Sequence, residues 1–305
     1  MPILHAEALP SRPLTAIACR QAEHMQLFHH RHARFLRFID TQQKWLLLHL
    51  TAHTCASAGL TRCETGAAAN WIADRATDLG IASRNTALAF FGQLAAYGYI
   101  ERRDCRADRR IKLVALSPET RRIMADWAAT LVASLLPDDI DDAAGPDDFW
   151  PIYLDIAGAV LDSPDYLVPP PDVRQIQEMR GGWLVISHML GHIDPNDVGF
   201  DRISLRDFNA PACARAFGLS RSTVYRLLRQ AGDAGIMGSG AEAQIPFVWL
   251  SGNYLQKYCR WNGSLFSAAH AACGISAHSE ATARKLPELR LGTASAIRAP
   301  AMSFL

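Results

Sequence analysis

The sequence lacks any long uninterrupted apolar stretch. No run approaches the roughly 18 consecutive apolar residues of a membrane-spanning helix. The first 20 residues contain three prolines, two of them well inside the segment, and no continuous apolar core, unlike a secretory signal peptide. Apolar residues make up 49% of the chain and charged residues 20%, as in ordinary globular domains. We therefore expect a cytoplasmic protein with no membrane segment.

Closely spaced cysteines are also missing. The seven cysteines are scattered, their number is odd, and no two form a C-x-x-C pair. Zinc sites and disulfide frameworks use clustered or evenly numbered cysteines. Because no secretory signal accompanies them, we expect reduced thiols rather than disulfide bonds or a zinc site.

Motifs of the common catalytic and nucleotide-binding folds are absent. The chain has no G-x-x-x-x-G-K-[ST], no G-x-G-x-x-G after a strand and no G-x-S-x-G. Two histidine pairs, His49 with His53 and His188 with His192, have the i, i+4 spacing of metal ligands on a helix. No third ligand follows them at a fixed spacing. We expect no enzymatic activity, no cofactor and no metal site.

Basic residues are absent from residues 131–171, which hold nine acidic residues. The net charge of +1 conceals this imbalance, since residues 31–130 contain 15 Lys and Arg against 9 Asp and Glu. Six of the acids lie in PDDIDDAAGPDD at 137–148, a composition typical of a solvated linker. The pattern predicts a basic first half followed by an acidic connection.

One segment of the chain occurs twice. Residues 80–100 read GIASRNTALAFFGQLAAYGYI, and residues 218–237 read GLSRSTVYRLLRQAGDAGIM. Nearly the same offset, 134 to 138 residues, relates three flanking pairs: Trp45 and Trp183, Leu116 and Leu250, Trp127 and Trp261. A period of this length fits two copies of a domain of roughly 100 residues rather than a solenoid.

The first copy begins with helical patterns. Residues 31–54 are amphipathic and predict one long helix, and residues 67–80 predict another that ends at Gly80, a suitable C-cap. Ser83 can cap the next helix, because its hydroxyl can accept the free N–H groups of the first turn. The expected buried stripe of that helix is Leu88, Phe91, Leu94 and Ala95.

A hairpin pattern follows these helices. Residues 99–103 and 111–116 predict two strands on either side of a basic tip, CRADRR at 105–110. Ser117 and Pro118 then begin a further helix, as N-cap and first helical residue. Helix, turn, helix, hairpin and helix, in this order, form a winged helix.

This segment resembles the MarR family of bacterial transcription regulators. The likeness is carried by DRRIKLVALSP at 108–118, close to the family's wing signature, and by SRNTALAFFGQLAAYGYIERR, close to its recognition helix and wing start. It covers about residues 66–127. The resemblance implies a second helix in the DNA major groove and a wing Arg in the minor groove, oriented by an Asp. Here Asp108 would orient Arg110, with Arg109 close by.

The chemistry of the residues supports DNA binding independently. The hairpin holds a cluster of cations suited to phosphate or a narrow minor groove: Arg102, Arg103, Arg106, Arg109, Arg110 and Lys112. The helix before it starts with Ser83, Arg84, Asn85 and Thr86, of which Arg can read guanine and Asn can read adenine. The alternative is a winged helix that contacts protein, with these charges as a solvated face.

The second copy keeps the helices but changes the wing. Residues 209–218, capped by Asn209, and residues 220–235 predict a helix-turn-helix. Its candidate DNA contacts are Ser220, Arg221, Ser222, Thr223 and Arg226. The wing, MGSGAEAQIPFVWL at 237–250, has no Arg or Lys, so we expect it to contribute little. The resemblance is correspondingly weaker over this copy, at about 203–261.

These patterns predict a mainly α fold with small β-hairpin wings. Two tandem winged helix-turn-helix repeats, flanked by long helices, arise from an internal duplication with an offset of about 134–138. The expected domains are a first repeat at 1–136, an acidic linker rich in Pro and Asp at 137–171, a second repeat at 172–275 and a weakly ordered tail at 276–305.

The predicted function is sequence-specific binding of double-stranded DNA by a transcription regulator. Two winged-helix repeats in one chain can supply both of the recognition helices that a palindromic site requires. The monomer would then be a pseudo-dimer. Two chains could also pair. The alternatives are a winged-helix structural or protein-interaction subunit and a plasmid replication initiator. Aromatic residues near Trp45 or Trp71 either line a cavity for a small-molecule effector or pack tightly.

Overall fold

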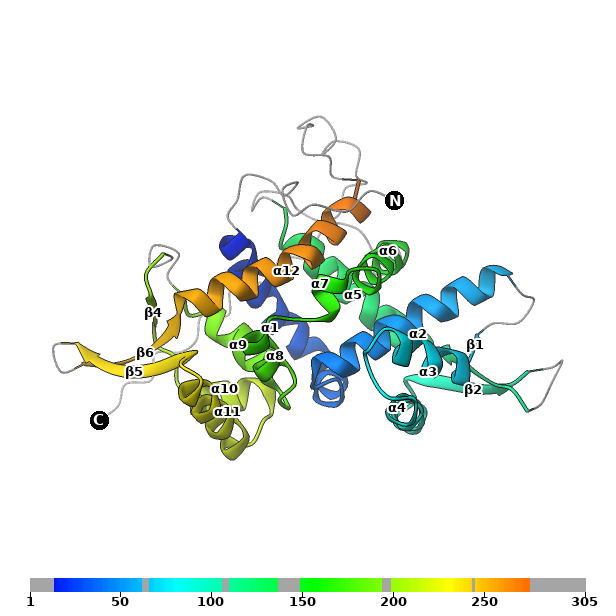
Figure 1. Ribbon diagram of the computed structural model, residues 1–305, viewed down its shortest axis with the longest axis horizontal. Coiled ribbons are helices and arrows are strands. Elements are labelled where there is room, and N and C mark those ends of the chain that lie inside the picture. Colours follow the sequence, from blue (N-terminus) through cyan, green and yellow to red (C-terminus); the bar gives the residue numbers. More distant parts are fainter. Residues whose placement is uncertain are drawn as a thin grey trace.

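The computed structural model describes residues 14–61, 66–105, 110–136, 149–193, 199–242 and 245–274. The molecule is mainly helical and elongated, with a small three-stranded antiparallel sheet toward each end (Figure 1). The predicted mainly α fold with β-hairpins is confirmed at this level. Within those ranges, every helix is too short or too polar to cross a lipid bilayer.

The first half of the chain forms a long helical pair and then a small mixed unit. In chain order its elements are α1 (Leu14–Phe38), α2 (Gln42–Thr61), β1 (Ala67–Ala68), α3 (Ala69–Asp78), α4 (Arg84–Ala96), β2 (Ile100–Asp104), β3 (Lys112–Leu116) and α5 (Pro118–Ala133).

The second half begins with four helices and ends in a second mixed unit. Its elements are α6 (Phe149–Leu161), α7 (Pro164–Leu167), α8 (Pro171–Gln177), α9 (Gly182–Leu190), β4 (Arg202–Leu205), α10 (Ala210–Phe217), α11 (Arg221–Asp233), β5 (Met237–Glu242), β6 (Ile245–Ser251) and α12 (Gly252–Ala272).

Both sheets have the same strand arrangement. The orders are β1-β3-β2 and β4-β6-β5, with Ala67 opposite Val114 in the first and Ile203 opposite Leu250 in the second. Each half therefore contains the order strand, helix, helix, hairpin and long helix. The sequence patterns did not predict β1 or β4, because β1 is only two residues long and a pair of alanines has no strand signature.

Capping residues are placed as the sequence predicts. Ser83, Ser117 and Asn209 each accept a hydrogen bond from the backbone N–H three residues later, at 2.7 to 3.2 Å. These bonds satisfy free donors in the first turns of α4, α5 and α10. Gly80, just after α3, has a φ of +66°, which favours glycine at the end of a helix.

The single helix expected over residues 31–54 is wrong. The chain leaves helical geometry between Phe38 and Gln42. There the carbonyl of Ile39 accepts a hydrogen bond from Trp183 Nε1 at 3.3 Å, and the carbonyl of Asp40 accepts one from Gly181 N at 2.8 Å. Contacts with the second half of the chain stabilise this break. The apolar pattern of residues 31–54 could not predict it, because these partners lie about 140 residues away.

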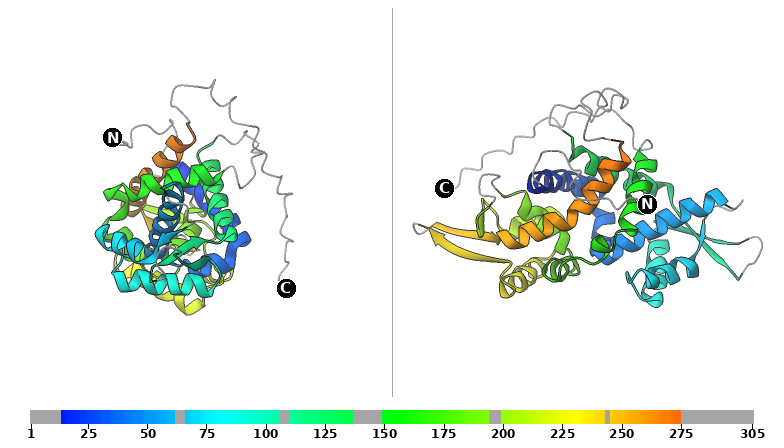
Figure 2. Two further views of the ribbon diagram at one scale, coloured as in Figure 1. Left: turned by 90° about the vertical axis from the view of Figure 1, so that its right-hand side faces the viewer. Right: turned by 45° about the horizontal axis from the view of Figure 1, so that its top comes forward.

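The two halves exchange helices around one shared core. α1 packs on α9 and α12 as well as on α5 of its own half, and α6 packs on α2 and α5 as well as on α12 of its own half (Figures 1 and 2). By their place in the element order, α2 of the first half corresponds to α9 of the second, and α5 corresponds to α12. The contacts of α1 with the second half are therefore equivalent to those of α6 with the first. The exchange makes the halves interdependent.

The acidic linker expected at 137–171 belongs to the folded core in its second part. Residues 137–148 lie outside the described residues. From Phe149 onward the chain is part of the core, since Tyr153, Ile156 and Ala157 of α6 are completely buried. The sequence of α6, FWPIYLDIAGAVL, is strongly apolar, and its pattern at 150–161 already allowed a short helix. The three boundaries between the expected domains stay predictions, as does the tail at 276–305.

Candidate nucleic-acid interface

The first helix-turn-helix unit is formed by α3 and α4. Ile81 N donates a hydrogen bond to Ala76 O at 2.9 Å and closes the turn between the two helices. The buried face of α4 consists of Ala87, Phe90, Phe91 and Leu94. Of the expected stripe, Phe91 and Leu94 are fully buried, whereas Leu88 and Ala95 are half-buried at its margin.

The start of α4 is available to a ligand. Ser83, Arg84, Asn85 and Thr86 are all solvent-exposed. Arg84 Nε lies 2.8 Å from Asp74 Oδ1, and both side chains are more than half exposed. Water screens such a pair and reduces its strength to about 0–1 kcal/mol, so Arg84 can exchange Asp74 for a phosphate or a base.

The second helix-turn-helix unit is formed by α10 and α11. Val224, Leu227 and Ala231 are the buried residues of α11. The outward residues form a basic face, with Thr223 half-buried at its edge: Ser220, Arg221, Ser222, Tyr225, Arg226 and Arg229. Among the described residues, no carboxylate lies within ion-pair distance of Arg221, Arg226 or Arg229. This face is therefore more strongly basic than the corresponding face of α4.

The two units lie on the same side of the molecule. α4 and the α10–α11 pair occupy one long edge, and the hairpins β2–β3 and β5–β6 point toward opposite ends (Figure 1). The turned views agree with this placement (Figure 2). Neither α4 nor α11 is covered by the other half of the chain.

Two of the cations expected on the β2–β3 hairpin are paired with acidic side chains of the same hairpin. Arg102, Arg103, Arg110 and Lys112 are exposed. Arg103 pairs with Glu101 next to it, and Lys112 Nζ lies 2.6 Å from Asp104 Oδ1. Arg106, Asp108 and Arg109, at the tip of the hairpin, lie outside the described residues. The proposed orientation of Arg110 by Asp108 stays a prediction.

The β5–β6 hairpin has a different surface. Gly238 and Gly240 lie directly opposite Trp249 and Phe247, whose rings cover them. The guanidinium of Arg202, in the neighbouring strand β4, stacks on the Trp249 ring at 4.7 Å from its centroid. Cation–π contact of this kind fixes an arginine at the base of the hairpin. No sequence pattern pointed to this cation, because Arg202 lies in β4, outside the hairpin that it contacts.

The junction of α1 and α2 connects the two helix-turn-helix units. Gln43 Nε2 donates a hydrogen bond to Ile81 O in the α3–α4 turn, at 3.0 Å. On the other side, Gly181, which donates a hydrogen bond to Asp40 O at 2.8 Å, packs against Leu219 of the α10–α11 turn. The junction is thus linked to both turns, directly to the first and through Gly181 to the second.

Cations gather at this junction. Asp40, which is 7% exposed, accepts a hydrogen bond from Lys44 Nζ at 2.7 Å and pairs with Arg180 Nε at 3.0 Å. Arg37 is exposed close by, against Gly218 of the α10–α11 turn. Arg174 and Glu178 lie beside the same junction, so four cations face two carboxylates and leave an excess of positive charge between the two units. No motif pointed to them, because they come from positions far apart in the chain.

The two histidine pairs lie in packed surroundings. His49 is buried and its Nδ1 lies 3.0 Å from the hydroxyl of Tyr153, in a hydrogen bond that joins α2 to α6. His188 packs edge-on against Phe217 and against His192. Within the described part of the chain, no group of three His, Cys, Asp or Glu side chains is arranged to hold a metal ion.

Comparison with protein-family models, with curated proteins and with solved structures finds no match for this chain. The likeness to the MarR family therefore rests on the two motifs quoted from residues 83–118.

Proposed function

We propose that this chain is a transcription regulator that binds specific double-stranded DNA through two tandem winged helix-turn-helix units. The observation that carries the proposal is the exposure of α4 and α11 on one side of a shared core (Figure 1). A palindromic site requires two such helices about one turn of DNA apart. One chain with two heads meets that requirement as a pseudo-dimer.

Surface charge supports DNA over a protein partner. The α1–α2 junction, with its cations, lies between α4 and the α10–α11 pair, on the side that carries the exposed arginines of α11 (Figure 1). Phosphate contacts supply most of the non-specific affinity of DNA-binding proteins, and they require such a row of cations. A winged-helix subunit that binds protein would be favoured if one of the two helices were covered by the other half.

The two heads differ in the bases that they can read. α4 presents Arg84 and Asn85, whereas α11 presents Arg221, Ser222 and Arg226. Bidentate Arg selects guanine and bidentate Asn selects adenine in the major groove. We infer an asymmetric operator, with a guanine-rich half-site under α11.

Binding of the purified full chain to genomic DNA fragments tests the proposal. Arg84→Ala and Arg221→Ala should each lower specific affinity by about five-fold to more than a hundred-fold, the usual cost of a lost base contact. Arg260→Ala, an exposed arginine on α12, is the matched control. If neither substitution changes the DNA affinity, or if the wild-type chain does not bind DNA, the protein-interaction subunit is favoured. Genomic target mapping then separates a regulator from a replication initiator.

A further inference from the structure

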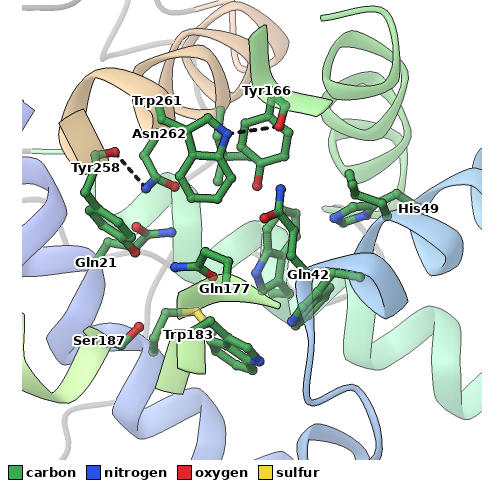
Figure 3. A pocket seen from close by; sticks show the side chains of 15 residues that line it. Gln21, Gln42, His49, Tyr166, Gln177, Trp183, Ser187, Tyr258, Trp261 and Asn262 are labelled. Atoms are coloured by element: carbon green, nitrogen blue, oxygen red, sulfur yellow. Dashed lines mark hydrogen bonds between the residues drawn. The ribbon is translucent and has the colours of Figure 1, made fainter. Parts of the chain in front are cut away.

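Residues that correspond in the repeat meet at the centre of the molecule. Trp45 and Trp183 lie edge to face with their ring centroids 5.8 Å apart. Trp127 and Trp261, a second corresponding pair, line the same cavity of about 80 Å³ between the two halves (Figure 3). Trp71 is 56% exposed on α3 and takes no part in it. Because two corresponding pairs line one cavity, an approximate twofold axis that relates the halves passes through it.

The segments that precede α2 and α9 also correspond, and they meet beside this axis. Trp183 Nε1 donates a hydrogen bond to Ile39 O at 3.3 Å. Gly181 N donates one to Asp40 O at 2.8 Å. The α1–α2 junction lies between α4 and the α10–α11 pair (Figure 1). The axis therefore reaches the surface at this junction, midway between the two proposed recognition helices.

The form of B-DNA determines what lies opposite this point in a complex. Two recognition helices about one helical turn apart enter successive major grooves on one face of the duplex. Half a turn from each of them, the minor groove faces the protein. With α4 and α11 bound as proposed, the junction would therefore face a minor groove that is only about 6 Å wide.

Arg180 is the residue of this junction best placed to enter a groove. Its side chain is 68% exposed, and its Nε lies 3.0 Å from Oδ2 of Asp40, whose side chain is only 9% exposed. The next residue, Gly181, is fixed by its own hydrogen bond to Asp40 O. Because Arg180 is held through its side chain and through the neighbouring peptide, it would lose little further freedom on binding.

The corresponding position of the first half carries no cation. The offset between Trp45 and Trp183 is 138 residues, and the same offset relates Arg180 to Gln42. Gln42 is buried, with 8% of its surface exposed. Glu178 is exposed two residues before Arg180, but the four cations of the junction outnumber its two carboxylates. A single exposed arginine near the axis matches one narrow groove.

We propose that Arg180 enters the minor groove at the centre of the operator and selects A·T base pairs there. Runs of A·T pairs narrow this groove and strengthen its negative potential, which attracts arginine. A G·C pair adds the 2-amino group of guanine, a hydrogen-bond donor, to the floor of the groove. This inference rests on the proposed function. It specifies the bases between the two half-sites, which neither recognition helix reads.

Binding of the full chain to three versions of one site tests this role. The site is a genomic fragment that the wild-type chain binds, with its half-sites located by footprinting and only the base pairs midway between them changed. The three centres contain A·T, G·C or inosine·cytosine pairs. Inosine lacks the 2-amino group, so its pair with cytosine resembles A·T in the minor groove and G·C in the major groove.

We expect the wild-type chain to bind the A·T and inosine·cytosine centres equally. It should bind the G·C centre about five-fold or more weakly, from the lower end of the usual cost of a mismatched base pair. Arg180→Ala should bind all three centres with the affinity of the wild type for the G·C centre. Arg260→Ala, an exposed arginine of α12, is the control and should keep the wild-type preference. A ratio of two affinities does not change with the fraction of active protein, so partial misfolding of a variant cannot imitate the result.

Three results would each overturn this inference: equal wild-type affinity for the A·T and G·C centres, an inosine·cytosine centre that behaves like G·C, or a preference that survives Arg180→Ala. In any of these cases, an affinity that still falls in Arg221→Ala leaves the proposed function standing. A wild-type chain that binds no DNA overturns both proposals.

Discussion

Arg84 and Arg221 occupy matching positions at the starts of α4 and α11, but their electrostatic surroundings differ. Arg84 is held by Asp74 of the preceding helix. No described carboxylate holds Arg221. A DNA phosphate that approaches α4 must therefore displace Asp74 and overcome its repulsion, whereas one that approaches α11 meets neither obstacle.

Replacing Asp74 by Asn should tighten DNA binding by about two- to five-fold, the range of an exposed ion pair. The substitution releases Arg84 and removes a negative charge from the proposed interface. Fluorescence anisotropy with a labelled operator at fixed salt measures the change. Asp155→Asn, an exposed acid of α6 on the other side of the molecule, is the control. Equal affinities for the two variants would contradict the proposed role of α4.

Three buried histidines are held in the neutral form. Burial lowers the pKa of His29 and of His188 to about 4, with smaller contributions from His30 and Arg37 at the first and from His192 at the second. Burial alone lowers the pKa of His49 to about 3. In the unfolded chain each would have a pKa of about 6.5. The unfolded state thus binds more protons below that pH.

The free energy of unfolding should therefore fall as the pH drops from about 6.5 toward 4. Each of these histidines contributes a slope of up to about 1.4 kcal/mol per pH unit, and its contribution is fully present above pH 6.5. Urea unfolding at a series of pH values measures the slope. His49→Leu should reduce the slope, whereas the same change at the half-buried His53, one turn along α2, should leave it as it is.

At the scale of elements, the sequence predicted those features that depend only on residues close together in the chain. The caps at Ser83 and Asn209 were found because the bonding partner lies three residues away. The break at Ile39 and the strand β1 were not found, because each depends on a partner distant in the chain: Trp183 for the break and Val114 for the strand. The apolar pattern gives the helices but does not show where tertiary contacts interrupt them.

The β5–β6 hairpin depends on close contact between glycine and aromatic residues. A methyl group at Gly238 would come within 2.4 Å of the Trp249 ring. Gly238→Ala should therefore push the indole away, disturb its stacking with Arg202 and destabilise the fold by about 1–3 kcal/mol, the usual cost of overpacking. Chemical denaturation measures the loss. Ser239→Ala, at the exposed neighbouring position, is the control, and equal stability of both variants would show that the indole is free to move.

At the scale of the whole molecule, the candidate interface is assembled from distant segments. The sequence identified the exposed starts of α4 and α11, because a repeated motif marks them. It did not identify Arg37, Lys44 and Arg180, which come together only when α8 and α9 pack on the α1–α2 junction. Pattern analysis detects groups that are close in sequence, and this cluster becomes close only in the fold.

Because α1 and α6 each pack on the other half of the chain, we expect the two halves not to fold when they are separated. A fragment of residues 1–136 lacks α6, and a fragment of residues 149–305 lacks α1, so each exposes an apolar face that the other covers. Neither fragment alone should show a cooperative thermal transition, but the two should copurify and regain one when they are coexpressed. The intact chain serves as the reference. A cooperative transition of the first fragment alone would contradict the shared core.

The exchange of helices also affects the order of events during synthesis. α1 ends at Phe38, and its partner α9 begins at Gly182, so 144 residues must be added between them. At about 5–20 residues per second, this takes roughly 7–30 s on the ribosome. Ile17, Phe28 and Leu36 of α1 are buried in the folded protein. During that interval α1 lacks α9 and α12, two of the helices on which it packs. A nascent chain of this kind is a natural client for a ribosome-associated chaperone.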